Sequence, residues 1–99
     1  MPGAYWVNTV RRVVDQDRLD DYVRLAGPAI AAAGGTFVAR GRAVAAFELG
    51  STERTALIAF DSVEAAVAAY ESPAYQKALA ALGDGAERDI RIVEALDQP

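Results

Sequence analysis

The chain has 99 residues, 53% of them hydrophobic and 24% charged, and a net charge of −4 at pH 7. This composition is typical of one globular domain, spanning residues 1–99, and its acidic balance offers no basic surface to a phosphate backbone, so we expect no nucleic-acid partner. The sequence contains neither Cys nor His, which excludes disulfides, thiol nucleophiles, Ser-His-Asp catalysis and almost every transition-metal site. We predict a protein that uses no metal and no cofactor.

The hydropathy pattern indicates a small soluble protein. No apolar run is long enough to cross a bilayer, and the first ten residues lack the basic flank and apolar core of a signal peptide. We therefore expect a cytoplasmic location and no membrane partner. A chain of this length buries only about 60–65% of its unfolded surface, so it gains stability from association with a partner.

The first predicted element is a strand, Ala4–Val13. Because side chains alternate across a strand, it presents two sets of residues: Tyr5, Val7 and Thr9 on one face, and Trp6, Asn8 and Val10 on the other. Both sets are mostly apolar, which indicates that both faces of the strand are covered.

A helix follows, because acidic Asp15 and Asp17 suit a helix N-terminus and apolar residues then recur at helical spacing, at Leu19, Tyr22, Val23, Ala26, Ile30 and Ala33. Pro28 lies inside this pattern and cannot donate to the Arg24 carbonyl, so we predict a kink or break near Gly27.

After the Gly34-Gly35 helix stop, Thr36–Arg40 is predicted as a strand with a turn at Gly41-Arg42. Ala43–Leu49 is predicted to pair back on it as a hairpin arm, although alanine is a poor strand former. Gly50–Glu53 is then a surface loop.

The second half begins with an apolar strand, Thr55–Phe60. Asp61 and Ser62 can cap the helix that follows, Ser72 can cap a further helix with Pro73 at its first position, and Gly83-Asp84-Gly85 ends that helix. Ile90–Leu96 is predicted as the last strand, and Asp97–Pro99 as a frayed tail.

This order of elements forms two βαβ halves, which predicts an α+β fold: a ferredoxin-like βαββαβ antiparallel sheet with helices on one face. The strands are nevertheless apolar on both faces. We therefore expect the open face to pack on a second copy, which makes the protein a homodimer of the dimeric α+β barrel type.

Three segments carry a family resemblance: GGTFVARG at 34–41, FDSVEAAVAAYESPAYQ at 60–76 and DIRIVEA at 89–95. They resemble the bacterial domain-of-unknown-function family thirteen-thirty, within the dimeric α+β barrel superfamily, which includes cofactor-free monooxygenases, isomerases and ligand-sensing domains. The resemblance points to six positions, Tyr22, Arg40, Gly41, Arg54, Ser72 and Tyr75. The chain departs from the family pattern at Ala69, Gly83 and Ala95.

The candidate binding residues each have a structural alternative. Arg40 and Arg54 suit a guanidinium fork for a small carboxylate, but ion pairs with Glu48, Glu53 or Asp61 are the favoured interpretation. Tyr22 and Tyr75, like Tyr70, could line a pocket, but core packing with hydroxyls reaching the surface is favoured.

Asn8, which shares a strand face with Trp6, is the most informative candidate, because an inward amide in an apolar interior needs a partner. It could bind a ligand oxygen, or it could bind neighbouring backbone or the second copy. Ser72 is better explained as a helix cap than as a nucleophile, since the chain has no His base. An acidic cluster, at Asp15, Asp17, Asp20 and Asp21, is better explained as a solvated helix start than as a metal site.

Three functions remain open. The first is a homodimeric domain that binds a small organic molecule, acidic or aromatic, in a pocket between sheet and helices. The second is a cofactor-free enzyme, monooxygenase-like or isomerase-like, in which Tyr75 and Asn8 donate hydrogen bonds and Arg54 holds an acid. The third is a purely structural dimer module.

Overall fold

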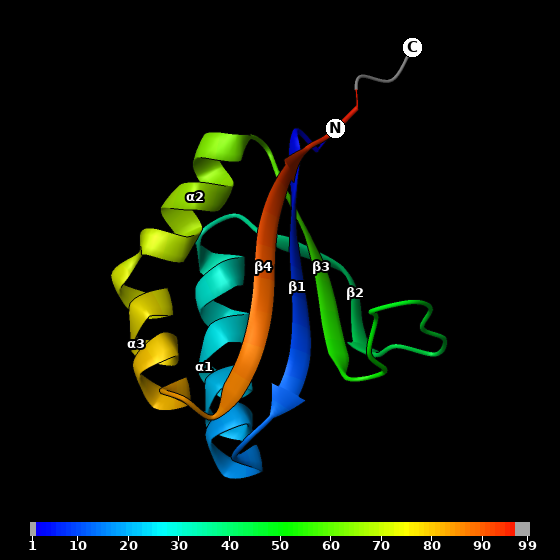
Figure 1. Ribbon diagram of the computed structural model, residues 1–99. Helices are drawn as coiled ribbons and strands as arrows, with labels where there is room; N and C mark the ends of the chain where they lie inside the picture. Colours follow the sequence, from blue (N-terminus) through cyan, green and yellow to red (C-terminus); the bar gives the residue numbers. More distant parts are fainter. Residues whose placement is uncertain (1, 97–99) are drawn as a thin grey trace.

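The computed structural model describes residues 2–96, which form four strands and three helices (Figure 1). In chain order they are β1 (Ala4–Val13), α1 (Gln16–Ala32), β2 (Thr36–Arg42), β3 (Arg54–Phe60), α2 (Val63–Glu71), α3 (Pro73–Leu82) and β4 (Ala86–Glu94). The strands pair antiparallel in the order β2-β3-β1-β4, and the helices cover one face of the sheet. The predicted ferredoxin-like α+β fold is confirmed; the predicted tail at 97–99 lies outside the described residues.

The core lies between the helices and the covered face of the sheet. The largest fully buried side chains are Trp6, Ile58, Phe60 and Tyr75. Trp6, Ile58 and Phe60 occupy alternate positions on β1 and β3, with Trp6 directly opposite Ile58, so strand alternation aims them all at the helices. The Trp6 ring stacks on Phe60 at 6.0 Å between centroids and meets Tyr75 edge-on at 5.0 Å. This aromatic contact ties α3 to the centre of the sheet.

The helix ends are fixed by the residues that the sequence indicates. Ser62 and Ser72 cap α2 and α3, accepting from the backbone N–H groups of Ala65 and Tyr75 at 3.0 and 3.3 Å. Pro73 takes the first position of α3, and Gly83 ends that helix with φ +52°, a conformation that favours glycine.

Pro28 does not break α1, which runs without interruption from Gln16 to Ala32. Of the predicted kink or break near Gly27, the break is therefore wrong. The carbonyl that Pro28 leaves without a donor belongs to Arg24, an exposed residue, so water can satisfy it. Burial of Ala26, Ala29 and Ile30 on both sides of the proline holds the helix against the core.

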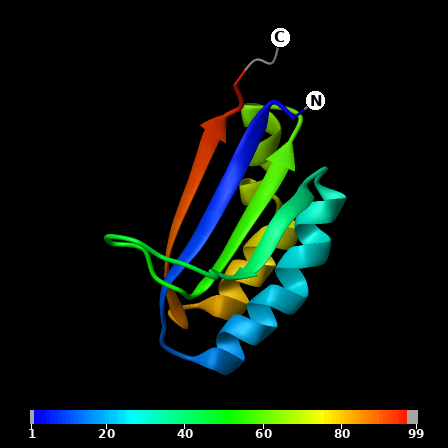
Figure 2. The ribbon, with the colours of Figure 1, turned by 90° about the vertical axis from the view of Figure 1, so that its right-hand side faces the viewer.

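The predicted hairpin arm is also wrong. β2 extends through Arg42 and pairs with β3, and Ala43–Glu53 forms no strand. The alanine-rich run offers little for a strand to pack, and the segment becomes a loop that stands out from the open face (Figures 1 and 2). Its large apolar side chains are exposed to solvent: Phe47 is 82% exposed and Leu49 is 94% exposed. We call Ala43–Glu53 the arm.

The open face of the sheet, turned to the viewer in Figure 2, carries the opposite set of strand residues. Its apolar side chains are Tyr5, Val7, Leu57, Ala59 and Val93, and most are half-buried even without a covering layer. Within residues 2–96, no helix combines the length and apolarity needed to cross a membrane.

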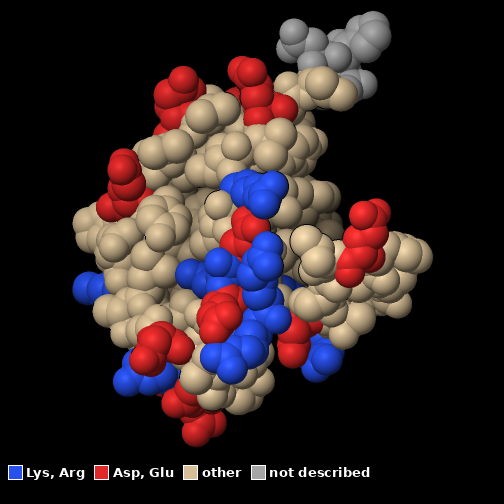
Figure 3. All heavy atoms as spheres, in the orientation of Figure 1, with Lys and Arg blue, Asp and Glu red and all other residues tan. Residues whose placement is uncertain are grey.

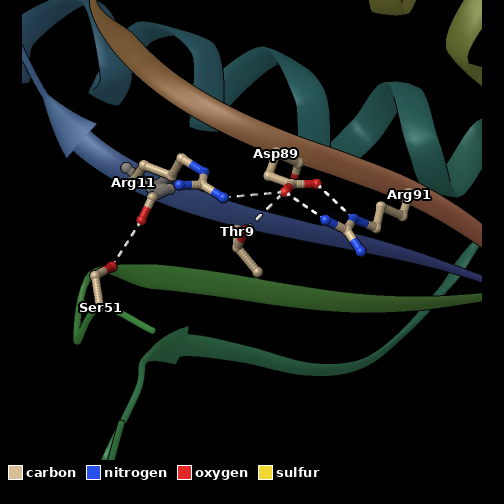
Figure 4. A network of polar contacts seen from close by, with 6 residues as sticks. Thr9, Arg11, Ser51, Asp89 and Arg91 are labelled. Carbon is tan, nitrogen blue, oxygen red and sulfur yellow. Dashed lines mark hydrogen bonds and ion pairs between the residues drawn. The ribbon is translucent and has the colours of Figure 1, made fainter. Parts of the chain in front are cut away.

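The end of the open face that lies next to Ser51 of the arm carries charged side chains. Basic and acidic side chains alternate along β4 and the lower part of β1 (Figure 3). Arg91 donates to both carboxylate oxygens of Asp89 at 3.0 and 3.1 Å, and Arg11 lies 3.6 Å from the same carboxylate (Figure 4). The guanidinium of Arg91, followed by that of Arg11, holds the pKa of Asp89 below its usual value. Ser51 of the arm joins this end by donating to the Val10 carbonyl at 3.0 Å.

Candidate functional site

The register of the sheet brings distant candidate residues into neighbouring rows on the covered face. Asn8 lies opposite Ala56, and Ala56 lies opposite Arg40, so these three residues form one row across β1, β3 and β2. Arg54 precedes Ala56 by two positions on β3 and therefore points to the same side. Strand pairing thus assembles two arginines and an amide from three separate strands.

Tyr22 of α1 lies on the helix side of this region. Tyr22 and the strand residues together line a recess of about 30 Å³. Asn8, Tyr22, Arg40 and Arg54 all contribute, and the remaining wall is apolar: Val23, Ala26, Gly27, Ile30, Phe37, Ala56 and Ile58. A volume of this size holds a water molecule or a single small polar group. The recess is therefore too small for an organic molecule.

Wider hollows adjoin the recess on both sides. One of about 370 Å³ lies between the start of α1 and the Arg42–Arg54 end of the sheet, and one of about 670 Å³ lies over β2 beside Gly27 and Pro28. Both share Val23 and Arg54 with the recess. We call the recess and the two hollows the groove; it runs between α1 and strands β2 and β3 and has room for a small organic molecule.

The two arginines that line the recess, Arg40 and Arg54, differ from most of the others. Six of the nine arginines in the chain lie within 3.9 Å of a carboxylate oxygen, namely Arg11, Arg12, Arg18, Arg24, Arg42 and Arg91. Within residues 2–96, Arg40, Arg54 and Arg88 have no such partner. The favoured expectation of ion pairs from Arg40 and Arg54 to Glu48, Glu53 or Asp61 is wrong, because Glu53 instead pairs with Arg42 at 3.9 Å.

Arg88 is a site residue that the sequence analysis missed. It lies opposite Val10 on the covered face, and its guanidinium stands 4.5 Å from the centre of the Tyr22 ring. The signal was present, because Arg88 alternates with Ile90 and Ile92. The predicted strand began at Ile90, four residues after the observed start at Ala86, and so left Arg88 out.

Tyr22 and Tyr75 meet beneath α1 and α3. Their hydroxyl groups share a buried hydrogen bond of 2.7 Å, so neither hydroxyl reaches the surface, in contrast to the favoured expectation. Burial first, and then the Tyr22 phenol, raise the pKa of Tyr75 far above its usual value, although the nearby charge of Arg88 opposes this shift. Tyr75 is therefore a neutral donor or acceptor at physiological pH.

Three buried polar atoms have no hydrogen-bond partner among residues 2–96: the Asn8 Oδ1, the Trp6 Nε1 and one terminal guanidinium nitrogen of Arg88. A buried polar group without a partner costs free energy, about 1–3 kcal/mol in proteins. All three side chains come from the covered face of β1 and β4. Of these three residues, Asn8 lines the recess.

Ser72 lies apart from the groove. Its hydroxyl donates to the Ala69 carbonyl at 2.8 Å and accepts from the Tyr75 N–H at 3.3 Å, so it joins α2 to α3 and sets the position of Tyr75. The acidic residues at the start of α1 are exposed. Within residues 2–96, no three His, Cys, Asp or Glu side chains are grouped closely enough to hold a metal ion.

The fold defines the class of protein: a ferredoxin-like α+β domain. Within this class, the chain belongs to the family described as Domain of unknown function (DUF1330), whose model matches residues 3–96. The family resemblance noted from the sequence is thus confirmed. No curated protein matches the sequence significantly.

Solved structures share the fold at low identity. A protein of unknown function from Rhodopseudomonas palustris, RPA0582, gives a TM-score of 0.75 at 17% identity, covering 98% of this chain and 85% of its own. A dimeric ferredoxin-like protein of unknown function from Thermobifida fusca gives 0.67 at 16%, covering 95% and 92%. SnoaB, a cofactor-independent oxygenase from Streptomyces nogalater, gives 0.62 at 17%, covering 99% and 97%. Such identities establish a common fold.

Proposed function

We propose that this protein binds a small organic acid in the groove, with Arg40 and Arg54 holding the carboxylate. The observation that carries this proposal is that Arg40 and Arg54, which both line the recess, lack the carboxylate partners that six other arginines have. A guanidinium presents a planar set of donors that matches a carboxylate. A ligand carboxylate would supply the missing partner.

The surroundings of the two arginines favour an aromatic or otherwise flat acid. The Arg40 guanidinium stacks over the Phe37 ring at 4.6 Å from its centroid, which fixes the guanidinium plane at the edge of the groove. Val23 and Gly27 of α1 form the facing wall. A flat apolar body fits between these walls while its carboxylate reaches Arg40 and Arg54.

The test is isothermal titration calorimetry with benzoate as the probe acid. Arg54→Ala should weaken binding by about tenfold or more, because it removes one charge-assisted contact. The matched control is Arg12→Ala, which removes an exposed arginine paired with Glu87 at 2.8 Å and should leave affinity unchanged. If both variants weaken benzoate binding equally, the loss reflects the change in net charge and not a contact with Arg54. If the unmodified protein does not bind benzoate, the proposal is refuted.

A cofactor-free enzyme of monooxygenase-like or isomerase-like type is the second candidate. It is supported by the hydrogen-bonded phenols of Tyr22 and Tyr75, which lie buried beside the recess with Arg88 over the Tyr22 ring. Such hydrogen-bonding groups stabilise the oxyanion that forms on an enolised or phenolic substrate. SnoaB shares the fold and is a cofactor-independent oxygenase. Oxygen uptake with dihydroxynaphthalene as probe tests it: Tyr22→Phe should lower kcat while the benzoate affinity is retained.

We further propose a homodimer formed through the open face of the sheet. The apolar set of Tyr5, Val7, Leu57, Ala59 and Val93 forms one continuous surface, and the arm stands beside it with Phe47 and Leu49 uncovered. A second copy would cover both. Native mass spectrometry should give a dimer, and Val93→Asp should give monomers by placing a charge in the interface; a monomeric unmodified protein would contradict the proposal.

A bacterial source and a cytoplasmic location also remain proposals. The similar structures from Rhodopseudomonas palustris and Thermobifida fusca support a bacterial source, and the sequence pattern led us to expect the cytoplasm. Cell fractionation followed by immunoblotting tests the location, with recovery in a secreted or membrane fraction as the contrary result.

A further inference from the structure

The recess at the inner end of the groove restricts what the ligand can carry. Its volume of about 30 Å³ accepts a water molecule or one small substituent, but no ring. The hollow over β2 is much larger, about 670 Å³, and shares Val23, Gly27, Phe37, Arg40 and Arg54 with it. A ligand therefore keeps its body in the outer hollow and inserts a single group into the recess.

The chemistry of that group is set by Asn8. Its Oδ1 is buried and lacks a partner within residues 2–96, and the same amide carries N–H donors on its other side. A hydroxyl group both donates and accepts, so it satisfies the amide. A methyl group would leave Oδ1 without a partner, and a second carboxylate would place negative charge against it.

The register of the sheet orients such a ligand. Asn8 and Arg40 lie in one row, separated by Ala56, so their Cα atoms are about 10 Å apart, which is twice the spacing of neighbouring strands. The arginine side chains shorten this gap from the outer side. Between the two polar ends, the walls are apolar, with Phe37 on β2 and Ile30 on α1.

We infer that the ligands of this groove are hydroxylated aromatic carboxylic acids, with the hydroxyl group bound by Asn8 and the carboxylate held by Arg40 and Arg54. This inference rests on the proposed function and adds the second anchor. It makes Asn8 the specificity-determining residue, whereas the arginines supply affinity for any acid.

The experiment compares four probes by isothermal titration calorimetry: benzoate, 3-hydroxybenzoate, 4-hydroxybenzoate and 4-methoxybenzoate. With the unmodified protein, at least one hydroxybenzoate should bind about tenfold tighter than benzoate, because it satisfies the buried amide. The methoxy compound cannot donate a hydrogen bond and should lose that advantage. These comparisons require no variant, so they hold even where a substitution impairs folding.

Variants then assign the effect to residues. Asn8→Ala should bring the ratio of hydroxybenzoate to benzoate affinity, measured on that same variant, down to about one, and Arg54→Ala should weaken all probes together. Arg12→Ala is the control that changes neither. Equal binding of benzoate and both hydroxybenzoates to the unmodified protein, or an advantage that survives Asn8→Ala, would overturn this inference and leave the proposed acid site standing. Failure of every acid to bind would overturn both.

Discussion

Arginine side chains on the two faces of the sheet differ in whether they have a carboxylate partner. On the open face, Arg91 and Arg11 share the carboxylate of Asp89 (Figure 4). On the covered face, Arg42 pairs with Glu53, but Arg40, Arg54 and Arg88 have no carboxylate within reach among residues 2–96. This difference is the basis of the proposal that Arg40 and Arg54 hold a ligand carboxylate.

The faces also differ in how their polar groups are satisfied. On the open face, Thr9 donates to the Asp89 carbonyl at 3.4 Å and Ser51 donates to the Val10 carbonyl. On the covered face, the Asn8 Oδ1 and the Trp6 Nε1 have no partner. Buried polar groups without partners are often found at functional sites, so this difference supports the site proposed around Asn8.

The largest effect is expected in the aromatic core of the covered face. Trp6→Ala should destabilise the protein by about 3–5 kcal/mol, because it removes a fully buried indole and its contacts with Phe60 and Tyr75. Urea unfolding followed by circular dichroism measures this change. Leu25→Ala, on the exposed side of α1, is the control and should change stability by less than about 0.5 kcal/mol; a similar loss in both would contradict the layered core.

A smaller effect is expected from the buried phenol pair at alkaline pH. The pKa of Tyr75 is raised in the folded state, so its stabilisation is complete below the unfolded value of about 10 and is lost as pH rises above that value. Stability should fall by on the order of 1 kcal/mol per pH unit there. Tyr75→Phe should flatten this loss in thermal melts between pH 8 and 11, while Tyr5→Phe on the open face should not.

The smallest effect directly tests the contrast between arginines. Without ligand, Arg54→Gln should leave the melting temperature unchanged or raise it by a few degrees, because it removes a charge that lacks a partner. Arg91→Gln should lower the melting temperature, because it removes two hydrogen bonds to Asp89. Differential scanning fluorimetry separates the two outcomes, and a loss of stability in both would show that Arg54 is structural.

Most of the fold could be predicted because local signals were strong. Alternation over Ala4–Val13, the caps at Ser62 and Ser72, and Gly83 after α3 each correspond to an observed boundary. The errors came from residues whose local preference is weak or overridden. The alanines after Arg42 gave no clear strand or loop signal, and the exposed carbonyl of Arg24 let α1 continue through Pro28.

The site was predicted in its residue types but not in its arrangement. The sequence singled out Asn8, Arg40 and Arg54, yet their convergence depends on register, which joins residues from β1, β2 and β3. Whether an arginine has an ion-pair partner is likewise a tertiary property, as Glu53 illustrates by pairing with Arg42 rather than Arg54. Arg88 was missed because the start of its strand was placed too late.

The sheet order has a consequence for how the protein is made. Of the four strands in this sheet, β1 comes first in the chain, but it lies between β3 and β4, and contacts such as that from Thr9 to Asp89 join residues 80 positions apart. One edge of β1 therefore keeps unpaired backbone groups until β4 has left the ribosome. Contacts of such long range slow folding, and an unpaired strand edge can pair with other chains until β4 covers it.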